Sequence, residues 1–144
     1  QIEIPTARDD YADIAEMDAW TPAERLAYWA SEFDRCIRCY ACRQACPGCY
    51  CFECVSEQVD PHWTGIALEL PEKYFFHVMR AFHLAGRCVS CDACEAVCPM
   101  DIPLSKLNRK LAKEVEASFG YRTGDDPQDA PPLTTFDPEE KLRL

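Results

Sequence analysis

The feature that most constrains this chain is a cysteine spacing that occurs twice. The pattern C-x2-C-x2-C-x3-C-P is found in CIRCYACRQACP and again in CVSCDACEAVCP. Its cysteines are Cys36, Cys39, Cys42 and Cys46 in the first copy and Cys88, Cys91, Cys94 and Cys98 in the second. They account for most of the 11 cysteines in a chain of 144 residues. The two copies form an internal repeat, so one fold has to accommodate two equivalent cysteine loops.

This spacing is typical of 4Fe-4S ligation in bacterial ferredoxins. Three thiolates two residues apart can surround one cubane, and in two-cluster proteins the fourth cysteine of each run binds the other cluster. The spacing therefore predicts a first cluster bound by Cys36, Cys39, Cys42 and Cys98, and a second bound by Cys88, Cys91, Cys94 and Cys46. Two 4Fe-4S clusters are the expected cofactors. Because ligation is crossed, loss of either cluster should loosen the whole domain.

Zinc sites and disulfides are the competing interpretations of so many cysteines. Paired C-x2-C motifs also bind structural zinc, but one zinc ion uses four thiolates and leaves the duplicated pattern unexplained. Disulfides need an oxidising compartment. The N-terminus QIEIPTARDD has no basic region followed by an apolar one, so nothing marks the chain for secretion. We therefore expect a cytoplasmic protein.

Three further cysteines, Cys49, Cys51 and Cys54, follow the first motif in PGCYCFEC. A third metal site there would need a fourth ligand from elsewhere, because three thiols are one short of a closed site. Free thiols packed near a cluster are the favoured interpretation. We expect His77 and His83 to be packed or surface side chains of a helix and not ligands.

Three segments predict helices, and no segment shows sustained strand alternation. The first starts at Thr21 as N-cap, with Pro22 at the first helical position and Glu24 completing a capping box. Its expected inward face is Leu26, Trp29, Ala30 and Phe33. The second runs from about residue 71 to 85, with Tyr74, Phe75, Val78, Phe82 and Ala85 inward and Gly86 as its stop. The third runs from about 103 to 119, with Leu104, Leu107, Leu111 and Val115 inward and Gly120 ending it.

These elements predict an all-α, mostly helical fold with three parts. Residues 1–20 carry no sustained apolar period and are expected to form an N-terminal arm. Residues 21–120 should form the domain that binds the two clusters. Residues 121–144 are rich in Gly, Asp and Pro and should form an extended C-terminal tail, either loose or lying on a partner.

Charge and hydropathy limit the partners. The formal net charge is -10, whereas binding to nucleic-acid phosphates needs clustered Lys and Arg, so we expect no nucleic-acid partner. The most apolar run, YFFHVMRAFHLAG, is interrupted by charged and polar residues and is too short to cross a bilayer, so we expect no membrane span.

The two cysteine motifs, the insertion ending in FHLAGRC and the segment IPLSKLNRKL resemble the alpha-helical ferredoxin family over roughly residues 30 to 120. That family occurs in succinate dehydrogenase iron-sulfur subunits and in the C subunit of heterodisulfide reductase. The stretch RCIRCYACRQACPGCYCFEC is also similar to iron-sulfur segments of hydrogenase and formate dehydrogenase beta subunits. Those proteins usually carry flavin, but this chain has no G-x-G-x-x-G loop, so a flavin role is not implied. The resemblance implies an electron-relay part of a larger complex whose other subunits carry flavin or metal.

A single-electron relay between redox partners is therefore the expected function, because a cubane with four protein thiolates leaves no open position for a substrate. Ile37, Tyr40, Val89 and Val97 are expected either to shield the clusters from water or to be ordinary core. Three alternatives stay open. One is a thiol or disulfide reductase component with a third metal site at Cys49, Cys51 and Cys54, and the others are a structural zinc adaptor and a freely diffusing ferredoxin.

Overall fold

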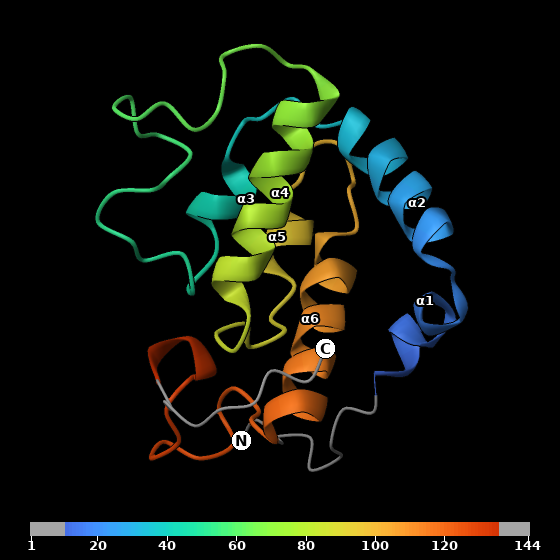
Figure 1. Cartoon of the computed structure of the whole chain (residues 1–144), viewed down its shortest axis with the longest axis vertical. Helices are drawn as coiled ribbons and strands as arrows, with labels where there is room; N and C mark the ends of the chain where they lie inside the picture. Colours follow the sequence, from blue (N-terminus) through green and yellow to red (C-terminus); the bar gives the residue numbers. More distant parts are fainter. Residues whose placement is uncertain (1–10, 136–144) are drawn as a thin grey trace.

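Helices and connecting loops make up the part of the chain that the structure describes, residues 11–135 of a computed structural model (Figure 1). The helices, in chain order, are η1 (Ala12–Ile14), α1 (Ala15–Ala19), α2 (Pro22–Asp34), α3 (Ala41–Gln44), α4 (Leu70–Leu84), α5 (Ala93–Ala96), α6 (Leu104–Phe119) and η2 (Pro132–Thr134). Within residues 11–135 the sole β pairing is one isolated bridge between Val59 and His62. The predicted mostly helical fold is confirmed.

Helix α2 begins as the sequence predicts. The Thr21 side chain accepts a hydrogen bond from the Glu24 backbone N–H, and the Glu24 carboxylate accepts one from the Thr21 N–H at 2.7 Å, which completes a capping box. Trp29 and Phe33 are buried, but Leu26 is 58% exposed, contrary to the predicted inward face. The last turn of α2 leads the chain directly to Cys36, whose N–H donates to the Phe33 carbonyl.

Helix α4 packs on α2, but its buried face differs from the predicted one. Phe82 is 57% exposed, and Tyr74, Phe75 and Val78 are only half-buried. The residues that α4 buries are Lys73, Phe76, His77, Arg80, Ala81 and Leu84. Three of these are polar or cationic, so a search for apolar periodicity alone selects the wrong face. The predicted stop is correct, because Gly86 follows the helix with a left-handed φ of 70°.

Helix α6 follows the prediction closely. It ends at Gly120, whose φ of 65° and N–H bond to the Glu116 carbonyl form a left-handed cap. Leu104 and Val115 are buried, as predicted, while Leu107 and Leu111 are partly buried. Asn108 is also buried on this face.

Residues 11–20, within the stretch of residues 1–20 for which the sequence predicted an arm, pack against the rest of the described structure. Ile14 and Met17 are buried in the main core together with Phe33 and Leu104. Ion pairs fix this segment to α6: Asp13 contacts Arg109 at 2.6 Å, and Asp18 contacts Lys110 at 2.6 Å and also Lys113. The sequence hides this role because two very short helices cannot display a sustained period. Residues 1–10 of the predicted arm lie outside the described part.

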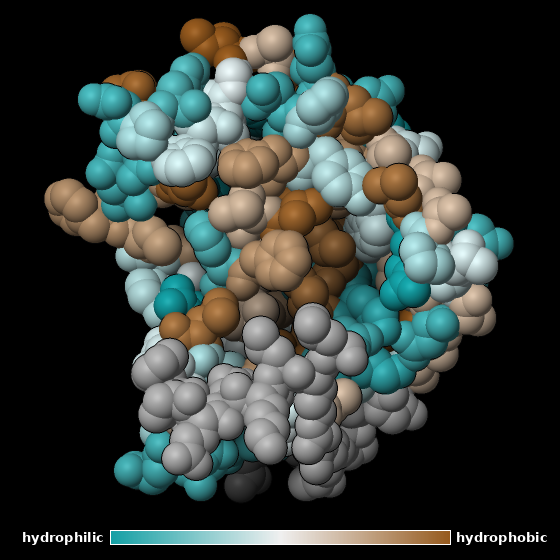
Figure 2. Space-filling model, in the orientation of Figure 1, coloured by the Kyte–Doolittle hydropathy of each residue, from teal (hydrophilic) through white to brown (hydrophobic). Residues whose placement is uncertain are grey.

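Two long segments without extended helix lie at the edge of the bundle in Figure 1. One is the loop of residues 45–69 between α3 and α4, and the other is the segment of residues 121–135 after α6. The second returns towards the end of α4, because a Cβ on Gly86 would come within 2.9 Å of Pro132. In Figure 2 hydrophobic side chains gather in the centre of the face shown, and many hydrophilic ones lie above them and to their right.

Candidate metal centres

The two cysteine motifs fold into matching loops. In the first, Arg38 and Tyr40 adopt left-handed φ values of 51° and 60°, and in the second, Ser90 and Asp92 adopt 53° and 56°. These residues occupy equivalent positions in the repeat. Tyr40 then caps α3 and Asp92 caps α5, and each short helix leads to the fourth cysteine of its motif. The sequence repeat is therefore also a structural repeat.

The left-handed turns bring backbone N–H groups towards the thiols. The Arg38 N–H donates to Cys36 Sγ at 3.3 Å, and the Ser90 N–H makes the equivalent contact with Cys88. The Glu95 N–H likewise faces Cys94. Such a concave row of N–H groups is a common binding site for anions and for Fe-S centres. Both loops can therefore stabilise thiolates and the inorganic sulfides of a cluster.

The predicted ligands come together in two separate hollows. One hollow is lined by Cys36, Cys39, Cys42 and Cys98. The other is lined by Cys46, Cys88, Cys91 and Cys94. The fourth cysteine of each motif thus faces the loop of the other motif, because α3 and α5 pack against each other. All eight are free thiols in the structure.

Both hollows place polar side chains beside their thiols. Among residues 11–135, no three His, Cys, Asp or Glu side chains converge closely enough to hold one metal ion. The walls also carry polar groups suited to sulfur. His77 lines the first hollow, is 2% exposed and has no hydrogen-bond partner for either ring nitrogen in the described part of the chain. Asn108 lines the second hollow and donates to Cys94 Sγ at 3.6 Å.

Burial shifts the pKa of several thiols in the two hollows. It raises the pKa of Cys42 to about 11 and also raises the pKa of Cys36, Cys88 and Cys94. A metal centre binds thiolates, so loading must release these protons. The Arg80 guanidinium acts in the opposite direction, because its positive charge lowers the pKa of both Cys42 and Cys94.

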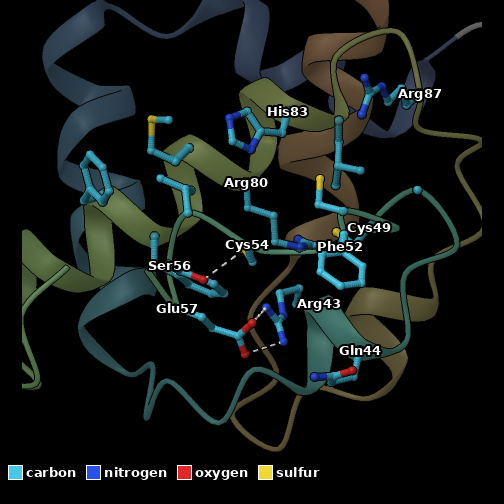
Figure 3. Close-up of a pocket in the computed structure, with 17 residues that line it drawn as sticks. Arg43, Gln44, Cys49, Phe52, Cys54, Ser56, Glu57, Arg80, His83 and Arg87 are labelled. Atoms are coloured by element: carbon cyan, nitrogen blue, oxygen red, sulfur yellow. Dashed lines mark hydrogen bonds and ion pairs between the residues drawn. The ribbon is translucent and has the colours of Figure 1, made fainter. Parts of the chain in front are cut away.

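The three cysteines outside the motifs line a third hollow of about 190 Å³, shown in Figure 3. Cys54 lies 3.1 Å from the Ser56 hydroxyl, and the neighbouring Arg43 pairs with Glu57 at 2.6 Å. Cys49 is half-buried and Cys51 is exposed. His83 lines the same hollow. These groups are not arranged as a single-ion site within the described residues.

The residues considered as shields against water are not uniformly buried. Ile37 is 49% exposed and Val89 is 54% exposed, although each lines the hollow of its own motif. Val97 is also exposed, and Tyr40 is half-buried with its ring edge against Phe76. Both cysteine loops therefore have a surface-facing side.

Sequence reasoning missed two polar residues beside the hollows, Arg80 and Asn108. The sequence predicted that His77 is a packed or surface side chain. Its burial and the stacking of its ring on Phe33, with 4.4 Å between the ring centroids, agree with packing. The sequence did not predict that His77 lines the first hollow. The available signal was spacing. Lys73, His77 and Arg80 lie on one helical face with Phe76 and Leu84, at intervals of three or four residues.

Two curated proteins similar to this chain are beta subunits of F420-dependent formate dehydrogenases. The chain is 36% identical over 108 residues to the F420-dependent formate dehydrogenase subunit beta of Methanocaldococcus jannaschii, covering 75% of this chain and 28% of that protein. It is 40% identical over 106 residues to the F420-dependent formate dehydrogenase 1 subunit beta of Methanococcus maripaludis, covering 72% of this chain and 26% of that protein. This chain is similar to one segment of formate dehydrogenase beta subunits. It spans about a quarter of their length. No protein-family model matches the chain.

The match agrees with the resemblance inferred from RCIRCYACRQACPGCYCFEC. No helix within residues 11–135 has the length and apolar character needed to span a bilayer.

Proposed function

We propose that this chain is the electron-transfer part of a formate dehydrogenase-type beta subunit, binds two 4Fe-4S clusters and passes single electrons between them. The first cluster would be bound by Cys36, Cys39, Cys42 and Cys98, and the second by Cys88, Cys91, Cys94 and Cys46. Its partners would be other parts of the complex that carry flavin or metal centres.

One observation carries this proposal: the fold gathers the eight cysteines into two groups of four, each completed by the other motif. The crossed sets match those expected when a two-cluster ferredoxin motif is duplicated. Zinc or disulfides would not require this exchange of the fourth cysteine. The similarity to formate dehydrogenase beta subunits supports the same function independently.

The packing of α3 against α5 supports transfer between the two centres. Cys42 and Cys94 are each close enough to Arg80 for its charge to act on both thiols. A single side chain thus lies beside both hollows, so the centres would be neighbours within one core. When bound, each cluster supplies a site that takes up and releases one electron.

The proposal is tested by measuring iron and acid-labile sulfide per chain in anaerobically purified protein, together with EPR spectra after dithionite reduction. About eight of each per chain, with interacting reduced 4Fe-4S signals, is the expected result. A Cys51→Ser variant is the matched control, because Cys51 lies outside both groups of four, and it should keep the full content.

Two outcomes would contradict the proposal. Zinc without sulfide would support a structural adaptor. About four iron atoms per chain would mean that one group of four cysteines binds no cluster. About twelve of each would instead add a third centre, for which Cys49, Cys51 and Cys54 are the available thiols.

A further inference from the structure

Arg80 is a buried cation with an unusual set of neighbours. Its side chain leaves α4 and reaches across the hollow of Figure 3 towards Cys49. Only 7% of the residue is exposed. One guanidinium nitrogen, Nη2, donates to the Cys42 carbonyl at 3.0 Å, and the guanidinium is also within hydrogen-bonding reach of the Cys49 and Cys94 thiols. Arg80 therefore touches both cysteine motifs.

Within residues 11–135, no carboxylate balances the charge of Arg80. Its Nε has no hydrogen-bond partner, and no Asp or Glu in the described part of the chain forms an ion pair with it. A buried cation without a counter-charge is strongly destabilising. The groups on which its charge acts are the thiols of Cys42, Cys49, Cys94 and Cys46. Deprotonated cluster ligands would supply the missing negative charge.

The other two buried cations near the first motif have different hydrogen-bond partners, and only Lys73 of the two faces a carboxylate. Arg38 is held by the Gly65 carbonyl at 2.6 Å and by the Tyr40 hydroxyl at 2.8 Å. Lys73 donates to the Asp34 carbonyl at 2.5 Å and faces the Asp34 carboxylate at 3.5 Å. Arg80 alone among these three contacts both halves of the duplicated site.

We propose that Arg80 is a positioning residue shared by the two clusters, and that its charge raises the reduction potential of both. The proposal rests on the proposed function. Reduction adds one electron to a cluster, and no bond forms or breaks. A fixed positive charge in a site of low dielectric favours the state with the extra negative charge. The two potentials should therefore shift together when the charge is removed.

Two neighbours provide controls that affect one cluster each. His77 lines only the hollow with Cys36, and Asn108 lines only the hollow with Cys94. Substituting either one removes a polar group from one site and leaves the charge of Arg80 in place. A general loosening of the core would affect both potentials, whereas each of these substitutions should affect only one.

The experiment is a potentiometric titration followed by EPR, made on the wild-type chain and on Arg80→Met, Arg80→Lys, His77→Phe and Asn108→Leu. Arg80→Met should reduce the equilibrium constant for reduction of both clusters at least tenfold, which is about 59 mV for a one-electron couple. Arg80→Lys keeps the charge and should shift neither potential by that amount. His77→Phe and Asn108→Leu should each shift one potential, and not the same one.

Iron and sulfide analysis of each variant separates the two proposals. If the wild type holds no clusters, the proposed function fails. If Arg80→Met holds both clusters with unchanged potentials, or if only one potential moves, the shared role of Arg80 is wrong. Should Arg80→Met fail to load, Arg80→Gln provides the test, because its amide can still donate to the Cys42 carbonyl without a charge. Unchanged potentials in Arg80→Gln would equally overturn the role.

Discussion

Cys54 differs from Cys49 in the charge and hydrogen bonds around its thiol. Burial raises the pKa of Cys54, but hydrogen bonds from Ser56 and Arg43 outweigh burial and bring the pKa below its usual value. For Cys49, burial raises the pKa to about 11 despite the nearby Arg80. Since only the thiolate is a nucleophile, Cys54 should be the more reactive thiol at a given pH.

We expect Cys54 to be alkylated by iodoacetamide faster than Cys49 in the loaded protein between pH 7 and 9. The sign follows from the pKa order: raising the pH ionises Cys54 first, because its pKa lies below the ordinary value of 9.0 and that of Cys49 lies above it. Mass spectrometry of the tryptic peptides measures both rates. Arg43→Met should slow the reaction at Cys54, and a rate that is unchanged by this substitution would argue against the role of Arg43.

At the residue scale, the grouping of the cysteines was predictable from the sequence, and the polar side chains around them were not. The C-x2-C-x2-C-x3-C-P spacing is a local property of the chain, and the two sets of four that crossed ligation predicts are the sets that line the two hollows. That these cysteines bind clusters stays a prediction. Arg80 and Asn108 come from helices distant in sequence from the loops that they contact. Helical spacing could have grouped Arg80 with the buried face of α4, but only the tertiary packing of α4 and α6 brings Arg80 and Asn108 to the thiols.

At the scale of elements, Arg38 links the first cysteine loop to the long segment before α4. Its Nη1 donates to the Gly65 carbonyl at 2.6 Å and to the Ala67 carbonyl at 3.2 Å. Arg43 makes a second link, to Glu57, near the middle of the same segment. Because residues 45–69 contain no helix, these side chains replace the backbone hydrogen bonds that would otherwise hold the segment.

Replacing Arg38 with Met should release the end of this segment without removing the cysteine ligands. Hydrogen exchange measured by mass spectrometry on the loaded protein should become faster in the peptides that cover residues 60–69. The matched control is Arg43→Met, which should instead affect peptides around residue 57. Equal exchange in wild type and Arg38→Met would mean that other contacts hold the segment.

The capping residues predicted where the three long helices begin or end. The hydropathy pattern predicted only some of the side chains that these helices bury. Thr21, Pro22 and Glu24 define the start of α2 through local hydrogen bonds, and Gly86 and Gly120 end α4 and α6 through left-handed conformations. The prediction of the buried face of α4 was wrong because that face includes two cations, Lys73 and Arg80. Lys73 donates to the end of α2, and Arg80 donates to the first cysteine motif. Hydropathy cannot rank such residues as buried.

At the scale of the whole molecule, the cysteine loops depend on contacts that join distant parts of the chain. Arg35, at the end of α2, donates to the Met100 carbonyl at 2.9 Å, just after the second motif. Glu95, in α5, accepts a hydrogen bond from the Ser105 N–H at the start of α6 at 3.2 Å. Residues 11–20 then pack on α6 through Asp13 and Asp18. The division into an arm, a domain of residues 21–120 and a tail remains a prediction, and residues 11–20 pack with the core.

Crossed ligation makes a specific prediction about which thiols become reactive when one ligand is lost. Cys46→Ser should expose Cys88, Cys91 and Cys94 to alkylation before the cysteines of its own motif, because those three share its hollow. Cys98→Ser should expose Cys36, Cys39 and Cys42 first, for the same reason.

The measurement is the initial alkylation rate of each cysteine by mass spectrometry, read alongside iron content on anaerobic protein. Cys51→Ser should change neither, since Cys51 lies in neither group of four. If Cys46→Ser instead exposed Cys36, Cys39 and Cys42 first, each motif would bind its own cluster. The position of each fourth cysteine in the hollow of the other motif would then not reflect ligation. If each substitution first exposes the three cysteines of the other motif, both motifs contribute ligands to both sites. The fold and the clusters must then assemble together.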